Sequence, residues 1–148
     1  MKISRETDYA IRCLLQLARR PEGVSTVREI SGPRGIPPVF LAKILQKLGR
    51  AGMTESVRGA RGGFRLARDP AEITLLSVIE AVEGPLAPND CLVEGNRCSQ
   101  AGRCSVHPVW RELRETLAGM LAAVTLRQLA EREGNADPRE YHLAKEGT

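Results

Sequence analysis

Two helix-forming segments joined by a tight turn constrain the fold of this chain more than any other feature of its sequence. The first begins with Thr26-Val-Arg-Glu29, a capping box in which the threonine and glutamate side chains accept hydrogen bonds from backbone N–H groups, and ends at Gly32-Pro33. The second begins at Pro37-Pro38 and carries apolar side chains on one side of residues 40–48. The pair predicts a helix-turn-helix, although two ordinary surface helices would share this pattern.

A glycine-rich segment follows the second helix directly. Two short strand-like runs flank Gly59-Ala-Arg-Gly-Gly63, and glycine is dense where a hairpin turn needs positive φ. A β-hairpin after a helix-turn-helix is a wing, expected here at about residues 54–67. With further helices expected at 4–20 and 74–84, residues 1–84 are predicted to form a winged helix-turn-helix DNA-binding domain, and the fold is predicted to be mainly α with one small hairpin.

The basic residues are concentrated in this part of the chain. The formal net charge is +4, but residues 28–68 alone carry +7 and the remainder −3. A confined positive surface is expected where a protein meets phosphates, whereas one exposed valine could contact a thymine methyl group. The expected DNA-binding residues are Arg28, Val39, Lys43, Lys47, Arg50, Arg58, Arg61 and Arg65.

Length and composition exclude several other classes of protein. The chain has 148 residues and a mass of 16.2 kDa, about the size of one domain. No apolar run approaches a membrane span and no signal peptide opens the sequence, so a cytoplasmic protein with no membrane partner is expected. Its two histidines, His107 and His142, lie in no nucleophile-base or phosphate-loop pattern. We therefore expect neither an enzyme nor a small-molecule substrate.

Three of the four cysteines lie in one loop-like segment, residues 85–107. The pattern Cys91-x6-Cys98-x5-Cys104-x2-His107 gathers three thiols and an imidazole, which are ligands for zinc, iron and iron–sulfur clusters. No Cys-x2-Cys pair of the zinc-finger kind occurs, so the spacing favours an iron–sulfur cluster over zinc. Cys13 lies in an apolar helical run instead, and it is expected to be buried.

A longer helix is expected to begin near Pro108. Its apolar residues alternate in steps of three and four over about two heptads, a seam that would pair with a second chain or with the domain body. A homodimer is favoured, because helix-turn-helix repressors read two half-sites. The predicted seam consists of Trp110, Leu113, Leu117, Met120 and Val124. This helix and a short one after it are assigned to residues 108–133, and a polar tail to 134–148.

Five stretches together resemble the Rrf2 family of bacterial iron–sulfur regulators, the IscR and NsrR type, from Met1 to about Glu133. They are Thr7-Asp-Tyr-Ala-Ile-Arg12, the hairpin Ser56–Leu66, the three-cysteine loop, His107-Pro-Val-Trp-Arg-Glu-Leu113 and Thr125-Leu-Arg-Gln-Leu129. The resemblance implies a homodimer that binds double-stranded operator DNA with its third helix and wing. It also implies one cluster per subunit, whose assembly, oxidation or nitrosylation alters DNA affinity.

The resemblance leaves two candidates for the fourth cluster ligand. His107 matches the IscR-like pattern, which usually holds a 2Fe-2S cluster, whereas Asp8 matches the NsrR-like pattern, in which a carboxylate of the partner subunit completes a 4Fe-4S cluster. Local spacing favours His107, and with it 2Fe-2S over 4Fe-4S. Ala42 and Lys43 occupy the region where IscR has an acidic residue, so the target sequence is not carried over.

The function expected from these patterns is a transcriptional regulator, a repressor, that senses redox poise, nitric oxide or iron–sulfur status. One alternative is a winged-helix regulator with a structural zinc site. Another is a small iron–sulfur electron carrier, which would leave the +7 block and the glycine-rich wing unexplained.

Overall fold

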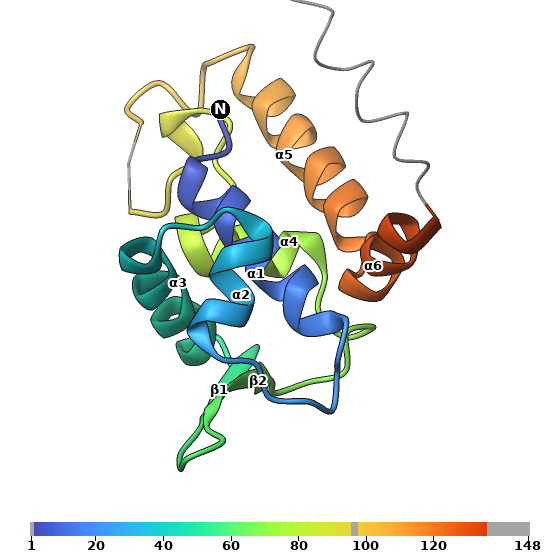
Figure 1. Cartoon of the computed structure of the whole chain (residues 1–148). Coiled ribbons are helices and arrows are strands. Elements are labelled where there is room, and N and C mark those ends of the chain that lie inside the picture. Colours follow the sequence, from blue (N-terminus) through green and yellow to red (C-terminus); the bar gives the residue numbers. More distant parts are fainter. Residues whose placement is uncertain (1, 96–97, 136–148) are drawn as a thin grey trace, which may run out of the picture.

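Helices make up most of the computed structural model, which describes residues 2–95 and 98–135 (Figure 1). The described elements are α1 (Arg5–Ala18), α2 (Val27–Arg34), α3 (Pro38–Arg50), β1 (Thr54–Val57), β2 (Gly63–Leu66), α4 (Leu75–Glu83), the 3₁₀ turn η1 (Asp90–Leu92), α5 (His107–Ala122) and α6 (Leu126–Asn135). The prediction of a mainly α fold with one small hairpin is therefore confirmed.

Side-chain caps fix where several of the helices begin. The Thr26 hydroxyl accepts a hydrogen bond from the Glu29 N–H at 3.3 Å, and the Glu29 carboxylate accepts one from the Thr26 N–H at 2.7 Å. The end predicted for this helix at Gly32-Pro33 is wrong, because α2 continues to Arg34. A proline in the last turn removes only one intrahelical bond, and the helix stops at Gly35, whose φ of +60° suits glycine.

The apolar face of α1 lies at the centre of the core. Leu14 and Leu17 of α1, with Leu41, Ile44 and Leu48 of α3, are almost completely buried. The predicted burial of Cys13 is confirmed at 0% exposure. Helices α1 and α3 each bury one apolar side against the other. The opposite side of α3 therefore faces solvent.

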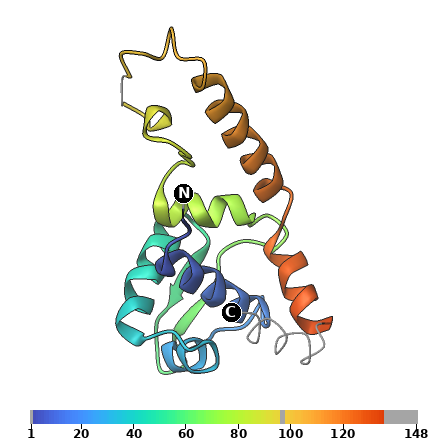
Figure 2. The same cartoon turned by 90° about the horizontal axis from the view of Figure 1, so that it is seen from above.

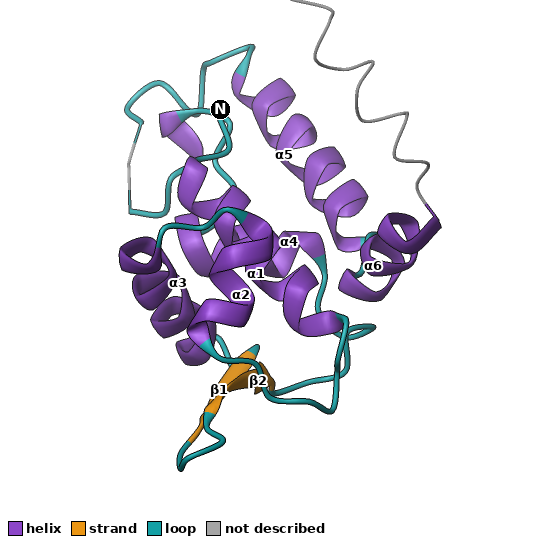
Figure 3. Ribbon diagram, in the orientation of Figure 1, coloured by secondary structure: helices purple, strands orange, loops and turns teal. Residues whose placement is uncertain are grey.

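The hairpin is held to the body by the segment before α2. The antiparallel register runs from Thr54 opposite Leu66 to Val57 opposite Gly63, and Phe64 exchanges two backbone hydrogen bonds with Ser25, of 2.8 and 2.9 Å. A Cβ atom on Gly63 would lie 2.3 Å from the Ser25 carbonyl oxygen, so only glycine permits this approach. The turn of the hairpin extends beyond the helical body (Figure 3).

The segment predicted as one C-terminal unit, residues 108–133, contains two helices with different surroundings. Helix α5 contacts α4 and η1 but has no buried residue, and it extends away from the body in Figure 2. Helix α6 returns to pack on α1, and Leu126 at its start is 3% exposed. The boundaries drawn at residues 84, 107 and 133 remain predictions, and the predicted polar tail lies outside the described residues from residue 136 onward.

A partly buried ion pair joins α6 to α2. The Arg34 guanidinium donates two hydrogen bonds to the Glu133 carboxylate, of 2.7 and 2.8 Å, and a third to Gln16 of α1 at 3.0 Å. The Arg34 side chain is only 14% exposed. These hydrogen bonds hold the pKa of Glu133 below the ordinary value of 4.5. The pair therefore fixes the C-terminal helix to the first helix of the helix-turn-helix.

We predict that Glu133→Gln lowers the free energy of unfolding at pH 7 by about 1 to 2 kcal/mol, because it replaces charged hydrogen bonds with weaker ones. Since the folded-state pKa is depressed, the stabilisation is present above pH 4.5 and is lost as pH falls through the folded value. Urea unfolding at several pH values should show the two proteins converge in acid. Glu131→Gln, on an exposed position of the same helix, is the control, and an equal loss there would contradict the prediction.

Candidate functional site

The solvent side of α3 presents the predicted base-reading and phosphate-binding side chains. Val39 in its first turn is 72% exposed, Lys43 lies one turn further, and Arg50 ends the helix, both exposed. Arg28, in the first turn of α2, is exposed as well. Within the described chain, these three cations form no ion pair. They are therefore available to phosphate oxygens.

Lys47 differs from the other predicted DNA-binding residues. Its Nζ lies 3.0 Å from a carboxylate oxygen of Glu6 in α1 and donates to the carbonyl of Val82 in α4 at 3.2 Å. The ammonium group is thus directed at neighbouring helices rather than left unpaired on the surface. A contact between Lys47 and DNA stays a prediction from the sequence.

The hairpin carries two of its three predicted arginines without an ion pair among the described residues. Arg58 and Arg61, in the connection between the strands, are exposed. Arg65 donates to the Glu55 carboxylate across the strands at 2.5 Å, and both side chains are about half exposed. The net positive charge of the wing therefore lies at its tip.

A groove of about 640 Å³ runs between α3 and the hairpin. Lys43 and Gln46 line it from α3, and Ser56 and Phe64 line it from the strands. Gln46 was absent from the sequence-based set, although it lies one turn beyond Lys43 and two turns beyond Val39. An amide at such a position can form paired hydrogen bonds with the edge of a base.

The predicted metal ligands occupy the loop between α4 and α5 and the start of α5. Cys91 lies in η1, Cys98 is exposed, Cys104 is half-buried, and all three thiols are free. His107 is the first residue of α5. Within residues 2–95 and 98–135, no three His, Cys, Asp or Glu side chains lie close enough together to hold a metal ion. The structure therefore does not bring the predicted ligand set together in one chain.

One atom of this set is nevertheless unusual. The Nδ1 atom of His107 is buried and has no hydrogen-bond partner among the described residues. A buried polar atom without a partner costs free energy, so it needs a partner that the described chain does not supply. Three free thiols and this imidazole nitrogen are donors that an iron–sulfur cluster accepts. The residues present therefore fit such a group in chemistry.

The alternative ligand Asp8 has a partner on its own helix. Its carboxylate lies 2.7 Å from the guanidinium of Arg12, and both side chains are about half exposed. Ligation by Asp8 would require this surface ion pair to open, at small cost. Cys13, by contrast, is removed from metal chemistry, because burial raises the pKa of its thiol to about 12.

Helix α5 presents an apolar stripe to solvent. Leu113 and Met120 of the predicted seam are 40% and 65% exposed, whereas Trp110 and Leu117 are half-buried. The assignment of Val124 to this helix is wrong, because α5 ends at Ala122 and Val124 lies in the connection to α6. Val109 adds a further 53% exposed side chain that the heptad pattern missed. A helix whose apolar residues are this exposed has a face that its own chain leaves uncovered.

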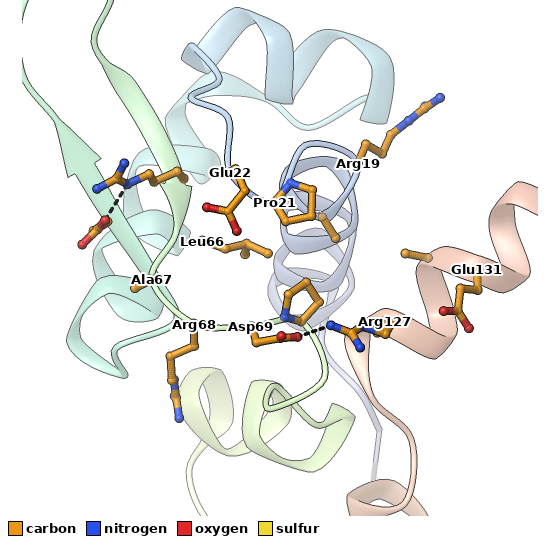
Figure 4. A pocket seen from close by; sticks show the side chains of 14 residues that line it. Arg19, Pro21, Glu22, Leu66, Ala67, Arg68, Asp69, Arg127 and Glu131 are labelled. Atoms are coloured by element: carbon orange, nitrogen blue, oxygen red, sulfur yellow. Dashed lines mark hydrogen bonds and ion pairs between the residues drawn. The ribbon is translucent and has the colours of Figure 1, made fainter.

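A second groove, of about 800 Å³, lies between the end of α1, β2 and α6 (Figure 4). Asp69 accepts a hydrogen bond from Arg127 at 2.7 Å. Arg68 donates to the carbonyls of Ala51 and Gly52 at 2.9 and 3.0 Å. Asp69, Arg127 and Arg68 are thus satisfied by the protein itself.

The helix-turn-helix, the wing and the unpaired cations on both define the class of protein: a winged-helix, DNA-binding transcriptional regulator. Residues 3–132 match the Rrf2 family, described as iron-dependent transcriptional regulators, and the chain belongs to this family. Like its relatives, it is a regulator and not an enzyme. No helix in the described part of the chain is long and apolar enough to span a membrane.

Individual relatives agree with this assignment. The chain is 34% identical over 131 residues to the transcriptional regulator IscR of Serratia proteamaculans, covering 87% of this chain and 79% of IscR. Among solved structures, CymR of B. subtilis, the global cysteine regulator, has a TM-score of 0.72 and 28% identity over 93% of this chain and 99% of CymR. IscR of T. potens has a TM-score of 0.72 and 26% identity, over 95% of this chain and 96% of that IscR chain.

We predict that Arg61→Ala weakens DNA binding. It should also reduce the slope of log affinity against log salt concentration by about 0.9 for each subunit bound, the value for one lost phosphate contact. Binding isotherms at several salt concentrations measure both effects. Arg132→Ala, an exposed cation on α6, is the control and should leave the slope unchanged. An unaltered slope for Arg61→Ala would remove this residue from the phosphate contacts.

Proposed function

We propose that this Rrf2 family member is a cytoplasmic, homodimeric repressor whose affinity for operator DNA is set by an iron–sulfur cluster in the loop between α4 and α5. The observation that carries the proposal is the donor set of that loop: three free thiols and the buried His107 Nδ1 without a partner in the described structure. When bound, the cluster would supply a group that is sensitive to oxidation and nitric oxide.

The place of the loop in the chain supports its regulatory role. Helix α4 packs on α1 and α3, and α5 packs on α4 beyond the loop. In Figure 1 the loop lies at the opposite end of the molecule from the hairpin tip, so the cysteines do not compete with DNA for the same surface. A change in the loop would therefore act on DNA through α4 and α5.

The proposed switch depends on how two copies are spaced. Two recognition helices read two half-sites only if their separation matches the DNA helical repeat. Cluster binding by Cys91, Cys98, Cys104 and His107 would shift α5, and with it the separation of the two α3 helices in the dimer. Cluster binding alters DNA affinity only to the extent that it favours one separation of the two α3 helices over another.

His107 is the proposed fourth ligand, with a 2Fe-2S cluster. Its Nδ1 has no hydrogen-bond partner among the described residues and is therefore free to bind a metal, whereas the Asp8 carboxylate is already paired with Arg12. A structural zinc site uses the same donors, so zinc remains the competing occupant. The electron-carrier alternative does not hold, because the family consists of transcriptional regulators.

We predict that protein purified without oxygen is coloured and contains iron and acid-labile sulfide, and that it differs in operator affinity from the cluster-free protein. His107→Ala should lose or alter the visible spectrum, whereas Asp8→Ala should retain it. Absorption spectra, metal and sulfide analysis, and footprinting measure these properties. Colourless protein that contains zinc and no sulfide would overturn the proposed iron–sulfur cluster. Equal operator affinity of the cluster-loaded and cluster-free forms would overturn the proposed control of DNA binding by the cluster.

We predict that Leu113→Glu combined with Met120→Glu makes the protein monomeric, because the two carboxylates would be buried against a second α5. Light scattering measures the mass, and operator affinity should fall because one half-site is lost. Arg111→Glu places the same side chain at an exposed position of α5 and should leave the mass unchanged. A dimeric double variant would show that the stripe is not the interface.

A further inference from the structure

Two lysines one turn apart on α3 have different environments. Lys43 is exposed and lines the groove between α3 and the hairpin. Lys47 is half-buried, and its ammonium lies between the Glu6 carboxylate and the Val82 carbonyl, at 3.0 and 3.2 Å. Both lysines lie off the apolar face of α3, so the sequence pattern treats them alike, but only Lys43 is left for DNA.

The partners of Lys47 lie at the end of α4. Val82 and Glu83 are the last two residues of that helix, where unpaired carbonyl groups attract a cation. Glu83 accepts hydrogen bonds from the Ser4 N–H at 2.8 Å and the Thr7 hydroxyl at 2.5 Å. Lys47 thus ties the recognition helix to the place where the start of α1 and the end of α4 meet.

The cysteine loop begins at the same place. Gly84 ends α4, and Leu86, two residues later, is 7% exposed. A hollow of about 410 Å³ is lined both by Ile3 and Glu83 and by Val93 of the loop. A displacement of the loop therefore reaches the end of α4, and the hydrogen bond from Lys47 to the Val82 carbonyl is a polar link from there to α3. The ion pair Glu6–Lys47 adds a link from the start of α1 to the same lysine.

We propose that Lys47 is a positioning residue that transmits the state of the cysteine loop to the recognition helix, and that it does not bind a DNA phosphate. The coupling between the loop and Lys47 rests on the proposed function, in which the loop controls DNA affinity. The claim that Lys47 faces the protein and not DNA is independent of the proposed function, because it follows from contacts within the described chain. This proposal replaces the DNA contact expected for Lys47 from the sequence.

The first test compares Lys43→Met with Lys47→Met in cluster-free protein. Each change removes one charge from α3 and keeps an unbranched side chain. We expect Lys43→Met to reduce the slope of log operator affinity against log salt concentration by about 0.9 for each subunit bound. Lys47→Met should leave this slope unchanged. Thermal unfolding and circular dichroism check that each variant is folded. A fall in slope for Lys47→Met equal to that for Lys43→Met would overturn the proposal.

The second test keeps every basic residue and removes the acidic partner of Lys47, which is Glu6. Glu6→Gln removes the charged partner of Lys47 and leaves only the Val82 carbonyl, so a positioning role predicts a smaller ratio of operator affinities between cluster-loaded and cluster-free protein, by about 2- to 30-fold. Lys47→Met should reduce the ratio at least as much, because it removes the contacts with both Glu6 and Val82, and Lys47→Arg should restore much of it. A phosphate ligand freed by Glu6→Gln would instead strengthen binding and steepen the salt slope, which would overturn the proposal.

The two proposals fail separately. A wild-type affinity ratio of one would refute control by the loop, and with it the coupling assigned to Lys47. The salt slopes of the cluster-free variants would still decide whether Lys47 faces the DNA.

Discussion

Burial of the apolar face of α1 is the constraint on which the rest of the structure depends. With few aromatic residues, the core is built from aliphatic side chains, and Leu14 and Leu17 of α1 are almost fully enclosed. Helices α2, α3, α4 and α6 and strand β2 all pack on α1. Each of these elements is therefore positioned relative to the others through one helix, and a shift of one element is transmitted to the others through α1.

Polar contacts at the two ends of α1 make this common packing specific. At its beginning, Ser4 and Thr7 bind Glu83 of α4, and Glu6 binds Lys47 of α3. Near its other end, Gln16 accepts a hydrogen bond from Arg34, which also holds Glu133 of α6. Helix α4, which leads to the cysteine loop, is thus joined to α3 through the start of α1. Helix α6, which follows α5, is joined to α2 directly by Arg34, and the same guanidinium binds the other end of α1.

Local rules in the sequence were sufficient to predict the helices, the hairpin and their order. The capping box at Thr26 and the turn glycine Gly59, whose φ is +115°, have physical causes within a few residues, and both are found in the structure. Gly63 is different, because its approach to the Ser25 carbonyl is a tertiary contact. The return of α6 onto α1 was not predicted, because only tertiary packing buries Leu126. For the same reason the pattern could not separate Lys47 from Lys43, since a helical period records the side of a helix and not what packs there. The ligand set of the cysteine loop is defined by donor chemistry alone, because residues Cys91 to His107 follow no helical or strand period.

The structure divides the basic block into two groups with different surroundings. Four of its cations are engaged by the protein: Arg34, Lys47, Arg65 and Arg68. Five form no ion pair within the described part of the chain: Arg28, Lys43, Arg50, Arg58 and Arg61. Neither acid of the block forms an ion pair with this second group among the described residues, because Glu29 caps α2 and Glu55 binds Arg65. The charge available to phosphates is therefore smaller than the count of basic residues suggests, but it is confined to the first turn of α2, the exposed side of α3 and the wing tip. Since each phosphate contact contributes separately to the salt dependence of binding, we expect the position of these five cations, rather than the net charge, to determine how the chain lies on DNA.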